Sequence, residues 1–256
     1  MNRFSDDRAY YNKFYADEND LVYGSSNLLM QQTYGNMIGL LIKENIITPD
    51  SNVLSLGCGS GTFEIKLAKH VKNIAGVDVS EVGIKKANLK ARKESLNNVI
   101  FEPGDIKILS YPPNSFNVIL AVEVLHHMSD EEIASALKSS LLCLKEGGAF
   151  VCFDPSSRRI INIFKPLFKK QISEYHTPEE RELDIKKIKE MLKAAGFIDI
   201  KMRYFDFFMS SLGFLLPRVS ARIARFIYVL DRLLVSTPGI CYFSSGFAGI
   251  AYKSRG

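Results

Sequence analysis

A glycine-rich stretch between two apolar runs restricts the fold of this chain more than any other feature. It reads VLSLGCGSGTFEIKLAKHVKNIAGVDVS over residues 53–80. An apolar run leads into Gly57, Gly59 and Gly61, a helical pattern follows, and a second apolar run reaches Asp78, 21 residues after Gly57. Glycines at such a turn let a ligand approach the backbone N–H groups at a helix N-terminus. The stretch therefore predicts a strand–loop–helix–strand unit that binds a nucleotide-like ligand.

Short β-rich runs alternate with helical patterns along the chain, as in a doubly wound α/β sheet. We expect strands at residues 52–57, 74–79, 99–104, 116–123, 148–154, 198–207 and 246–253. We expect helices at residues 62–71, 81–95, 130–144 and 178–195, and helical character within residues 1–50. The helix at 178–195 has Thr177 as its predicted N-cap, Pro178 at its first position and Gly196 at its end. A long insertion, residues 208–240, separates the last two strands.

The spacing of the glycines narrows the choice of ligand. A dinucleotide site usually shows the pattern GxGxxG, whereas the third glycine here comes one position early, which argues against NAD and FAD. Asp78 ends the second strand and is placed to accept hydrogen bonds from two ribose hydroxyls. A ribose-containing ligand is therefore favoured over a glycine-rich turn that binds nothing.

Five motifs in consistent order closely resemble those of class I S-adenosylmethionine-dependent methyltransferases of the small-molecule type. They lie within VLSLGCGSGTFEIKLAK, GVDVS, GDIKILSYPPNSFNVILAVEVLHHMSD and LKEGGAFVCFDP, about residues 50 to 155. The resemblance implies a Rossmann-like, mostly parallel seven-stranded sheet with an antiparallel last strand, an N-terminal helical segment and a helical insertion before the last strand. It also implies S-adenosyl-L-methionine as cofactor, S-adenosyl-L-homocysteine as product and methyl transfer as the reaction. One departure is Phe116-Asn117, where family members often have Phe-Asp.

The resemblance assigns cofactor contacts to the glycine-rich stretch. Gly57, Gly59 and Gly61 would pass beneath the methionine part of the cofactor, with Cys58 between them. Asp78 would bind the ribose hydroxyls.

Further cofactor contacts are implied at the ends of the next strands. Val79 would lie against the adenine, Asp105 would accept a hydrogen bond from its amino group, and Ile106 would pack on the ring. Glu123 and Val124 would lie near the sulfonium and the methionine end.

The N-terminal tyrosines have two interpretations. AYYNKFY at helical spacing is typical of a packing face. In the resembling family an N-terminal helix often forms a lid over the cofactor, so Tyr11 and Tyr23 are candidate contacts to its methionine end.

Histidines are the candidate catalytic residues. A general base is needed only where the acceptor must lose a proton, as a hydroxyl or an acidic carbon does. His127 follows the fourth strand, and His176 in SEYHTPEE precedes a predicted helix cap, so both are candidates. The alternative is structural: one of His126 and His127 packs under the next helix and the other holds a loop. No histidine pair shows metal-ligand spacing, so we expect no metal.

Basic charge is concentrated in the C-terminal half. Residues 155–235 hold 16 lysines and arginines against 9 acids. Within 208–240, four arginines (Arg218, Arg222, Arg225 and Arg232) follow at steps of 4, 3 and 7, which places them along one helix face, with apolar residues mainly opposite. We expect the apolar face to cap the acceptor pocket and the arginines to face outward. That arrangement predicts a hydrophobic, isoprenoid-, fatty- or polyketide-like acceptor, with O- or C-methylation favoured.

The same segments raise the question of partners. Basic amphipathic helices often lie on anionic membranes, so residues 158–170 and 208–240 are a candidate membrane surface. Nucleic acid is not expected, because the arginines are interleaved with aliphatic residues. The oligomeric state is open. Four scattered cysteines and the absence of a signal-like N-terminus favour a cytoplasmic protein, with membrane association as the further option.

We expect one methyltransferase domain over residues 1–256: an N-terminal lid (1–50), a cofactor-binding core (51–155) and acceptor-side helices with the final strand (156–256). The alternative function is a catalytically silent cofactor-binding or scaffold protein with the same fold. A nicotinamide-dependent oxidoreductase is the third option.

Overall fold

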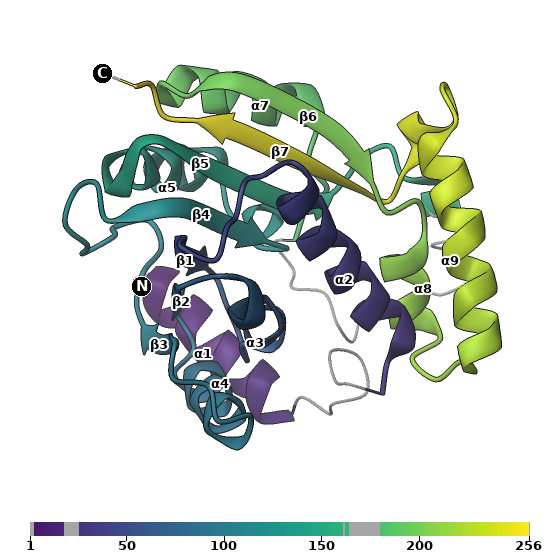
Figure 1. The fold of residues 1–256 in the computed structure, drawn as a ribbon, viewed down its shortest axis with the longest axis horizontal. Coiled ribbons are helices and arrows are strands. Elements are labelled where there is room, and N and C mark those ends of the chain that lie inside the picture. Colours follow the sequence, from purple (N-terminus) through teal and green to yellow (C-terminus); the bar gives the residue numbers. More distant parts are fainter. Residues whose placement is uncertain (1–2, 18–25, 161, 164–179, 256) are drawn as a thin grey trace.

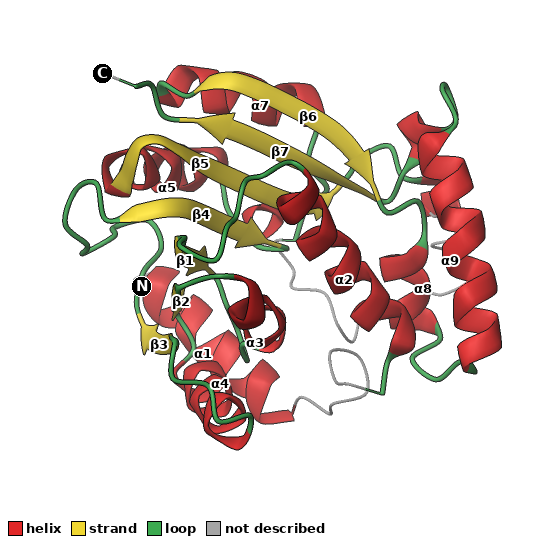
Figure 2. Cartoon of the chain, viewed as in Figure 1, coloured by secondary structure: helices red, strands yellow, loops and turns green. Residues whose placement is uncertain are grey.

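The computed structural model describes residues 3–17, 26–160, 162–163 and 180–255. A seven-stranded sheet runs through its centre, with helices on both faces (Figure 1, Figure 2). The strands are β1 (Asn52–Leu56), β2 (Asn73–Asp78), β3 (Val99–Pro103), β4 (Phe116–Val122), β5 (Leu144–Pro155), β6 (Ile198–Phe205) and β7 (Gly246–Tyr252). Their order across the sheet is β3-β2-β1-β4-β5-β7-β6. β7 is antiparallel to β5 and β6, while β1 to β5 pair in parallel, so the predicted α/β fold is confirmed.

The helices cover the sheet in two layers. They are α1 (Arg3–Asp17), α2 (Leu28–Lys43), α3 (Thr62–Leu67), α4 (Glu81–Lys93), α5 (Asp130–Cys143), α7 (Ile185–Ala195), α8 (Met209–Leu215) and α9 (Ala221–Ser236), with short 3₁₀ turns η1 (Ala68–His70), η2 (Leu125–His127) and η4 (Cys241–Phe243). One hydrophobic core joins the sheet to α2, α3 and α4, and a second joins it to α5 and α7. Because both faces are covered, β4 and β5 contain unbroken apolar runs, residues 118–122 and 149–153, as strands of parallel sheets do.

The starts of α5 and α7 differ in how well local sequence predicts them. α5 begins with a capping box, in which Ser129 and Glu132 satisfy each other's backbone N–H groups, as such a motif predicts. α7 begins at Ile185, with Asp184 as N-cap, and residues 180–184 are not helical, so a continuous helix over 178–195 is wrong. Thr177 and Pro178 lie outside the described residues. Leu183 explains the late start, because its N–H donates to the Pro155 carbonyl at 3.1 Å and its carbonyl accepts from Ser157 at 3.0 Å. Those strand-like bonds exclude the helical conformation there.

The insertion before β7 folds as two helices, α8 and α9, with Arg218 in the connection between them. They pack beside α2 at one end of the molecule (Figure 1). Asp231 in α9 joins the pair, since its Oδ1 accepts hydrogen bonds from the N–H groups of Phe208 and Met209 at the start of α8. None of the helices within the described ranges has the length and apolar character needed to cross a bilayer.

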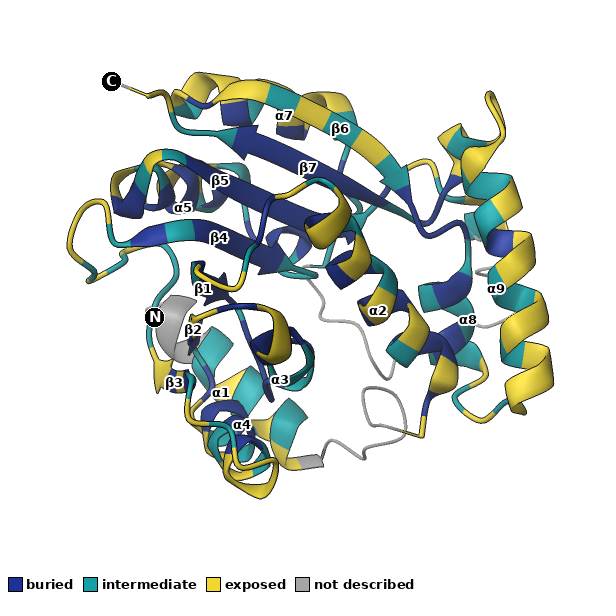
Figure 3. Cartoon of the chain, viewed as in Figure 1, coloured by how far each residue is buried: buried dark blue, intermediate teal, exposed yellow. Residues whose placement is uncertain are grey.

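The orientation of α9 differs from the prediction. Asp231 is fully buried, whereas Ile223, Phe226 and Leu233 on the predicted capping face are 51%, 69% and 62% exposed (Figure 3). Arg222 and Arg225 are exposed as well. The expectation that the apolar face points into the molecule is therefore wrong. The physical reason is the carboxylate of Asp231, which must reach the start of α8 and so turns its own side of the helix inward.

Candidate active site

The glycine-rich loop joins β1 to α3 with backbone conformations that suit glycine. Gly57 and Gly59 have φ angles of 64° and 52°, in the left-handed region. A Cβ at Gly57 would overlap with Val124, and one at Gly59 would overlap with the Tyr15 hydroxyl. Both positions therefore need glycine for conformation and for space.

Gly61 serves packing instead of the pocket. Its φ of 74° also requires glycine, but a Cβ there would lie 2.8 Å from Ala87 and 2.9 Å from Phe101. It lines neither of the two pockets at this edge of the sheet. Gly61 lets α3 start close to α4 and β3, and its predicted contact with the cofactor stays a prediction.

Two adjoining pockets, which enclose about 760 and 740 Å³ when the solvent at their mouths is included, lie at the carboxyl ends of β1, β2 and β4, where parallel sheets place their ligands. We call them the loop pocket and the Asp78 pocket. Both are lined by Tyr11, Gly57, Glu123 and His127. The loop pocket also takes in the predicted residues Cys58 and Gly59. The Asp78 pocket takes in the predicted residues Asp78, Val79, Asp105, Ile106 and Val124.

Asp78 is buried at the end of β2. Its Oδ2 accepts a hydrogen bond from the Gly59 N–H and its Oδ1 one from the Ser80 N–H, both at 2.8 Å. Burial raises its pKa to about 6 in spite of these two bonds. A carboxylate has about four acceptor positions, so capacity remains for two ligand hydroxyls.

A second acid, Glu64, lines the loop pocket from the first turn of α3. It is 2% exposed, and its Oε1 accepts a hydrogen bond of 2.6 Å from the Ser55 hydroxyl. Its Oε2 is buried without a hydrogen-bond partner, and burial raises the pKa of this carboxyl to about 7. An unsatisfied buried oxygen beside a pocket is a ready acceptor for a cationic or hydrogen-bonding ligand group.

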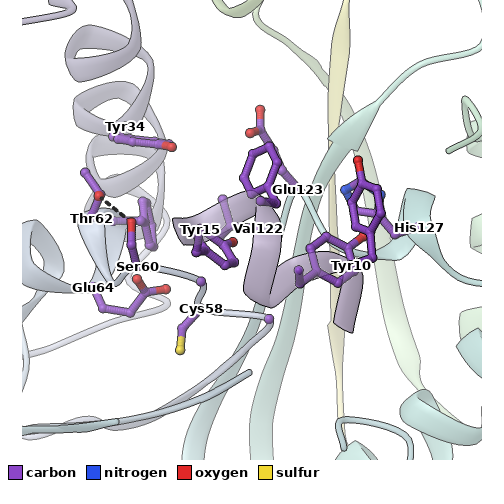
Figure 4. A pocket seen from close by; sticks show the side chains of 15 residues that line it. Tyr10, Tyr15, Tyr34, Cys58, Ser60, Thr62, Glu64, Val122, Glu123 and His127 are labelled. Carbon is purple, nitrogen blue, oxygen red and sulfur yellow. Dashed lines mark hydrogen bonds between the residues drawn. The ribbon is translucent and has the colours of Figure 1, made fainter. Parts of the chain in front are cut away.

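Aromatic side chains from three helices line the loop pocket, and we call them together the aromatic wall. Its aromatic residues are Tyr10, Tyr11, Phe14 and Tyr15 from α1, Tyr34 from α2 and Phe63 from α3. Figure 4 shows Tyr15 between the glycine loop and Glu123, and Tyr10 next to His127. α1 is held over the pocket by Asn12, whose Oδ1 accepts from the Ser80 hydroxyl at 2.9 Å and the Val82 N–H at 3.2 Å. Tyr23 lies outside the described residues.

Glu123 stands where the two pockets meet. Its φ of 54° is uncommon for a residue with a side chain, and its N–H donates to the Phe153 carbonyl at 2.7 Å. Burial raises its pKa to about 7, and the carboxylates of Asp154 and Glu180 add to the rise. Strained backbone and a perturbed acid in a cleft are typical of functional sites.

The two neighbouring histidines have different settings. His126 is buried, and its Nδ1 lies 2.9 Å from Asp154 Oδ1 while its Nε2 lies 3.5 Å from Glu180 Oε1. His127 lines both pockets and contacts the Tyr11 ring edge-on, with centroids 5.8 Å apart. His126 therefore ties the end of β5 to η2, and His127 faces the pockets. His176 lies outside the described residues.

The histidines also belong to a group that could hold a metal ion. One atom each from His126, His127 and Glu180 lie within 4.8 Å of one another. Spacing between histidines alone could not reveal this group, because its carboxylate comes from a distant part of the sequence. The expectation that no metal is bound stays a prediction.

Several site residues were missed from the sequence. Asp154 ends the apolar run of β5, the same signal that pointed to Asp78. Tyr10, Phe14 and Tyr15 lie in the AYYNKFY run that supplied Tyr11. Glu64 and Glu180 stand in ordinary helical and charged surroundings, so no local signal separates them from surface acids.

Comparison with known proteins agrees with this geometry. The model of a family described as methyltransferase domain matches residues 47–203, more than half of the chain. A ubiquinone biosynthesis O-methyltransferase of Coxiella burnetii is 34% identical over 107 residues, which are 42% of this chain and 44% of that protein. A demethylmenaquinone methyltransferase of Geobacillus stearothermophilus is 27% identical over 179 residues, 62% of this chain and 76% of that protein. For the first of these two, the matched part is thus less than half of the relative's length.

A solved structure shares the fold. Magnesium protoporphyrin IX methyltransferase from Synechocystis, determined with bound S-adenosylhomocysteine, superposes with a TM-score of 0.65 at 18% identity, covering 98% of this chain and 99% of that one. The chain therefore belongs to the methyltransferase-domain family, and its fold is that of the class I S-adenosylmethionine-dependent methyltransferases.

Proposed function

We propose that the enzyme methylates a hydrophobic, lipid-like small molecule at an oxygen or an acidic carbon. The observation that carries this proposal is the set of aromatic side chains that line the loop pocket together with Glu64, Glu123 and His127. Flat apolar groups pack well on such a wall. The names of the ubiquinone and demethylmenaquinone relatives support an acceptor with a ring and an isoprenoid chain.

S-adenosylmethionine supplies a methyl group on a sulfonium, which is already a good leaving group. In the Asp78 pocket, Asp78 is suited to the ribose hydroxyls, Asp105 to the adenine amino group, and Val79 and Ile106 to the adenine faces. Glu64 fits the α-ammonium group, because it lines the loop pocket and its Oε2 is a buried carboxylate oxygen that lacks a donor. These assignments place the reacting end of the cofactor near Glu123.

The remaining task is to align the acceptor and, for a hydroxyl or an acidic carbon, to remove a proton. Alignment alone supplies on the order of 7–11 kcal/mol of barrier lowering in well-oriented systems. His127 is the candidate general base, because it lines both pockets and imidazole accepts a proton near neutral pH. Glu123 shares this position and is the second candidate. His176 stays a prediction from the sequence.

We also propose that the acceptor is met at an anionic membrane surface. Most of residues 158–170 lies outside the described residues, and Arg159 there is already paired with Glu182 at 2.8 Å. The support therefore comes from the 208–240 segment. The division into a lid (1–50), a core (51–155) and an acceptor side (156–256) is likewise a proposal.

Transfer of a labelled methyl group tests the acceptor class. The panel is a prenylated demethyl-quinol, its head group without the isoprenoid chain, and a small water-soluble amine. We expect the prenylated compound to react with a kcat/KM at least about tenfold above the bare head group, since each buried methylene contributes about 0.8 kcal/mol. Preference for the amine would contradict the proposal. Tight cofactor binding with no S-adenosylhomocysteine release from any acceptor extract would favour the silent scaffold.

A further inference from the structure

The outward face of α9 carries five large apolar side chains in a row: Ile223, Phe226, Val229, Leu230 and Leu233. They are 51%, 69%, 51%, 38% and 62% exposed. Their steps of 3, 3, 1 and 3 residues keep them on one side of a helix about 24 Å long. Next to α9, Ile240, Tyr242 and Phe243 are 40%, 51% and 51% exposed. An apolar surface of this extent calls for an occupant.

We propose that the outward face of α9 inserts into the headgroup and acyl boundary of an anionic lipid bilayer. This inference rests on the proposed function for its purpose, the delivery of a lipid-like acceptor. The face that docks is the apolar one, where the sequence had suggested a face of arginines. Helices with such a face lie in the plane of a membrane, buried by about 5–10 Å.

Charge on the segment selects the occupant. Residues 209–243 contain four arginines and no lysine, glutamate or histidine, and their single acid is Asp231. Because Asp231 is fully buried, the exposed charge of the segment is wholly positive. Arg222 and Arg225 are exposed on α9. At 3.6 residues per turn, Arg225 flanks the apolar row, and Arg222 falls within its arc at the first turn of the helix, from which a long arginine side chain can reach lipid phosphates. An anionic membrane satisfies the apolar row and the arginines together.

A second copy of this chain is a poorer partner than a membrane for both the apolar row and the arginines of α9. A two-fold dimer through α9 would bring Arg222 and Arg225 of one copy toward the same residues of the other. Stable interfaces also take about 20–30 residues from each partner, whereas the outward face of α9 and the turn beside it offer far fewer.

The position of α9 suits delivery to the pocket. α9 packs against α2 and α8, and α2 supplies Tyr34 to the loop pocket. One helix, α2, therefore connects the docking face to the Tyr34 side of the loop pocket, while α1 lies on the other side of α2 from α9 (Figure 1).

Co-sedimentation with vesicles tests the proposal. The probes are phosphatidylcholine vesicles alone and vesicles with about one third phosphatidylglycerol, at about 25 mM and about 300 mM salt. We expect the full chain to partition at least about tenfold more strongly to the anionic vesicles at low salt, and the advantage to shrink at high salt. The double variant Phe226→Glu, Leu233→Glu should lose at least about tenfold of this binding. Arg222→Gln with Arg225→Gln should lose mainly the salt-sensitive part.

The matched control is Leu89→Glu with Leu142→Glu, which places two glutamates at side chains 55% and 65% exposed on α4 and α5. This control should bind vesicles like the wild type. Calorimetric titration with S-adenosylmethionine shows that each variant is folded, because the substituted residues line neither pocket.

Equal vesicle binding by the α9 double variant and the control would overturn the proposed docking face, as would no vesicle binding by the wild type. A dimer that the α9 variant dissolves assigns the face to a second copy instead. If vesicles bind as expected but no prenylated acceptor is methylated, the proposed function fails and the docking face stands.

Discussion

Asp78 and Asp231 are both buried carboxylates that accept two hydrogen bonds from backbone N–H groups, yet their settings differ. Asp78 lies at the carboxyl edge of a parallel sheet, and its side chain lines a pocket. Asp231 joins two helices, and its carboxylate acts on the carboxyl group of Asp206, whose pKa it helps to raise. The first can offer its remaining acceptor capacity to a ligand, and the second can offer it only to protein. Burial and hydrogen bonding alone therefore do not distinguish a binding acid from a structural one.

The same contrast separates two unsatisfied oxygens. Glu64 Oε2 and Asp231 Oδ2 are both buried without hydrogen-bond partners. Leaving such an oxygen unpaired costs about 1–3 kcal/mol. A ligand donor can recover that cost at Glu64, which lines the loop pocket, but not at Asp231, which lines neither pocket. We call Asp78 and Glu64 the pocket acids, and Asp206 and Asp231, which bond to the start of α8, the helix-joint acids. The following variants test whether only the pocket acids affect cofactor binding.

The largest effect is expected from Asp78→Asn. The amide keeps one acceptor oxygen but loses the charge and places an NH₂ group toward a backbone N–H. We expect the affinity for S-adenosylmethionine to fall roughly 100-fold, about 2.7 kcal/mol, as measured by calorimetric titration. Asp206→Asn is the matched control and should bind the cofactor like the wild type. Equal losses in the two variants would remove the distinction.

Asp231→Ala should act on folding instead of binding. It removes the acceptor for two N–H groups at the start of α8 and leaves a small cavity between α8 and α9. We expect the free energy of unfolding to fall by about 2 kcal/mol in urea denaturation, with unchanged cofactor affinity. Asp231→Asn retains an acceptor and should recover most of the loss. A lower cofactor affinity in Asp231→Ala would show that the contact between α8 and α9 also affects the pocket.

Glu64→Gln should weaken the cofactor complex about tenfold, or about 1.4 kcal/mol, because the ammonium loses its charged partner. Ser55→Ala serves as the comparison. It removes the hydroxyl bonded to Oε1 and leaves the carboxylate, so its effect on affinity should be smaller. The comparison is decided by titrating both variants with S-adenosylmethionine and with S-adenosylhomocysteine. Larger loss in Ser55→Ala would assign Glu64 to packing.

These cases also show what a sequence can predict. Gly57, Gly59 and Asp78 were predictable, because a turn with left-handed backbone and a strand-ending acid are local features with a fixed relation in parallel sheets. The orientation of α9 was not, since two helix faces were both credible and a single buried aspartate decided between them. The start of α7 was missed for a similar reason, as Leu183 pairs with residues far away in sequence. Local patterns thus predicted the sheet and the edge at which the two pockets lie, while long-range polar contacts determined where α7 begins and how α9 is oriented.

The pH dependence of stability gives the smallest expected effect and compares the two acid sites once more. Burial and the nearby Asp231 carboxylate raise the pKa of Asp206 above its ordinary value. The folded chain therefore holds a proton that the unfolded chain has released, beginning near pH 4, the usual range of an aspartate. The stabilising contribution is complete below that pH and is lost as the pH rises toward neutrality, because the unfolded state then binds fewer protons than the folded state.

Asp206→Asn should reduce this loss of stability by on the order of 1 kcal/mol between about pH 4 and pH 7, as measured by urea unfolding at several pH values. Asp78→Asn should reduce it too, since burial also raises the pKa of Asp78, but only Asp78 should transmit the effect to cofactor affinity. An unchanged pH slope in Asp206→Asn would mean that the Asp206 carboxyl releases its proton alike in the folded and unfolded chains, and that the two helix-joint acids interact only weakly.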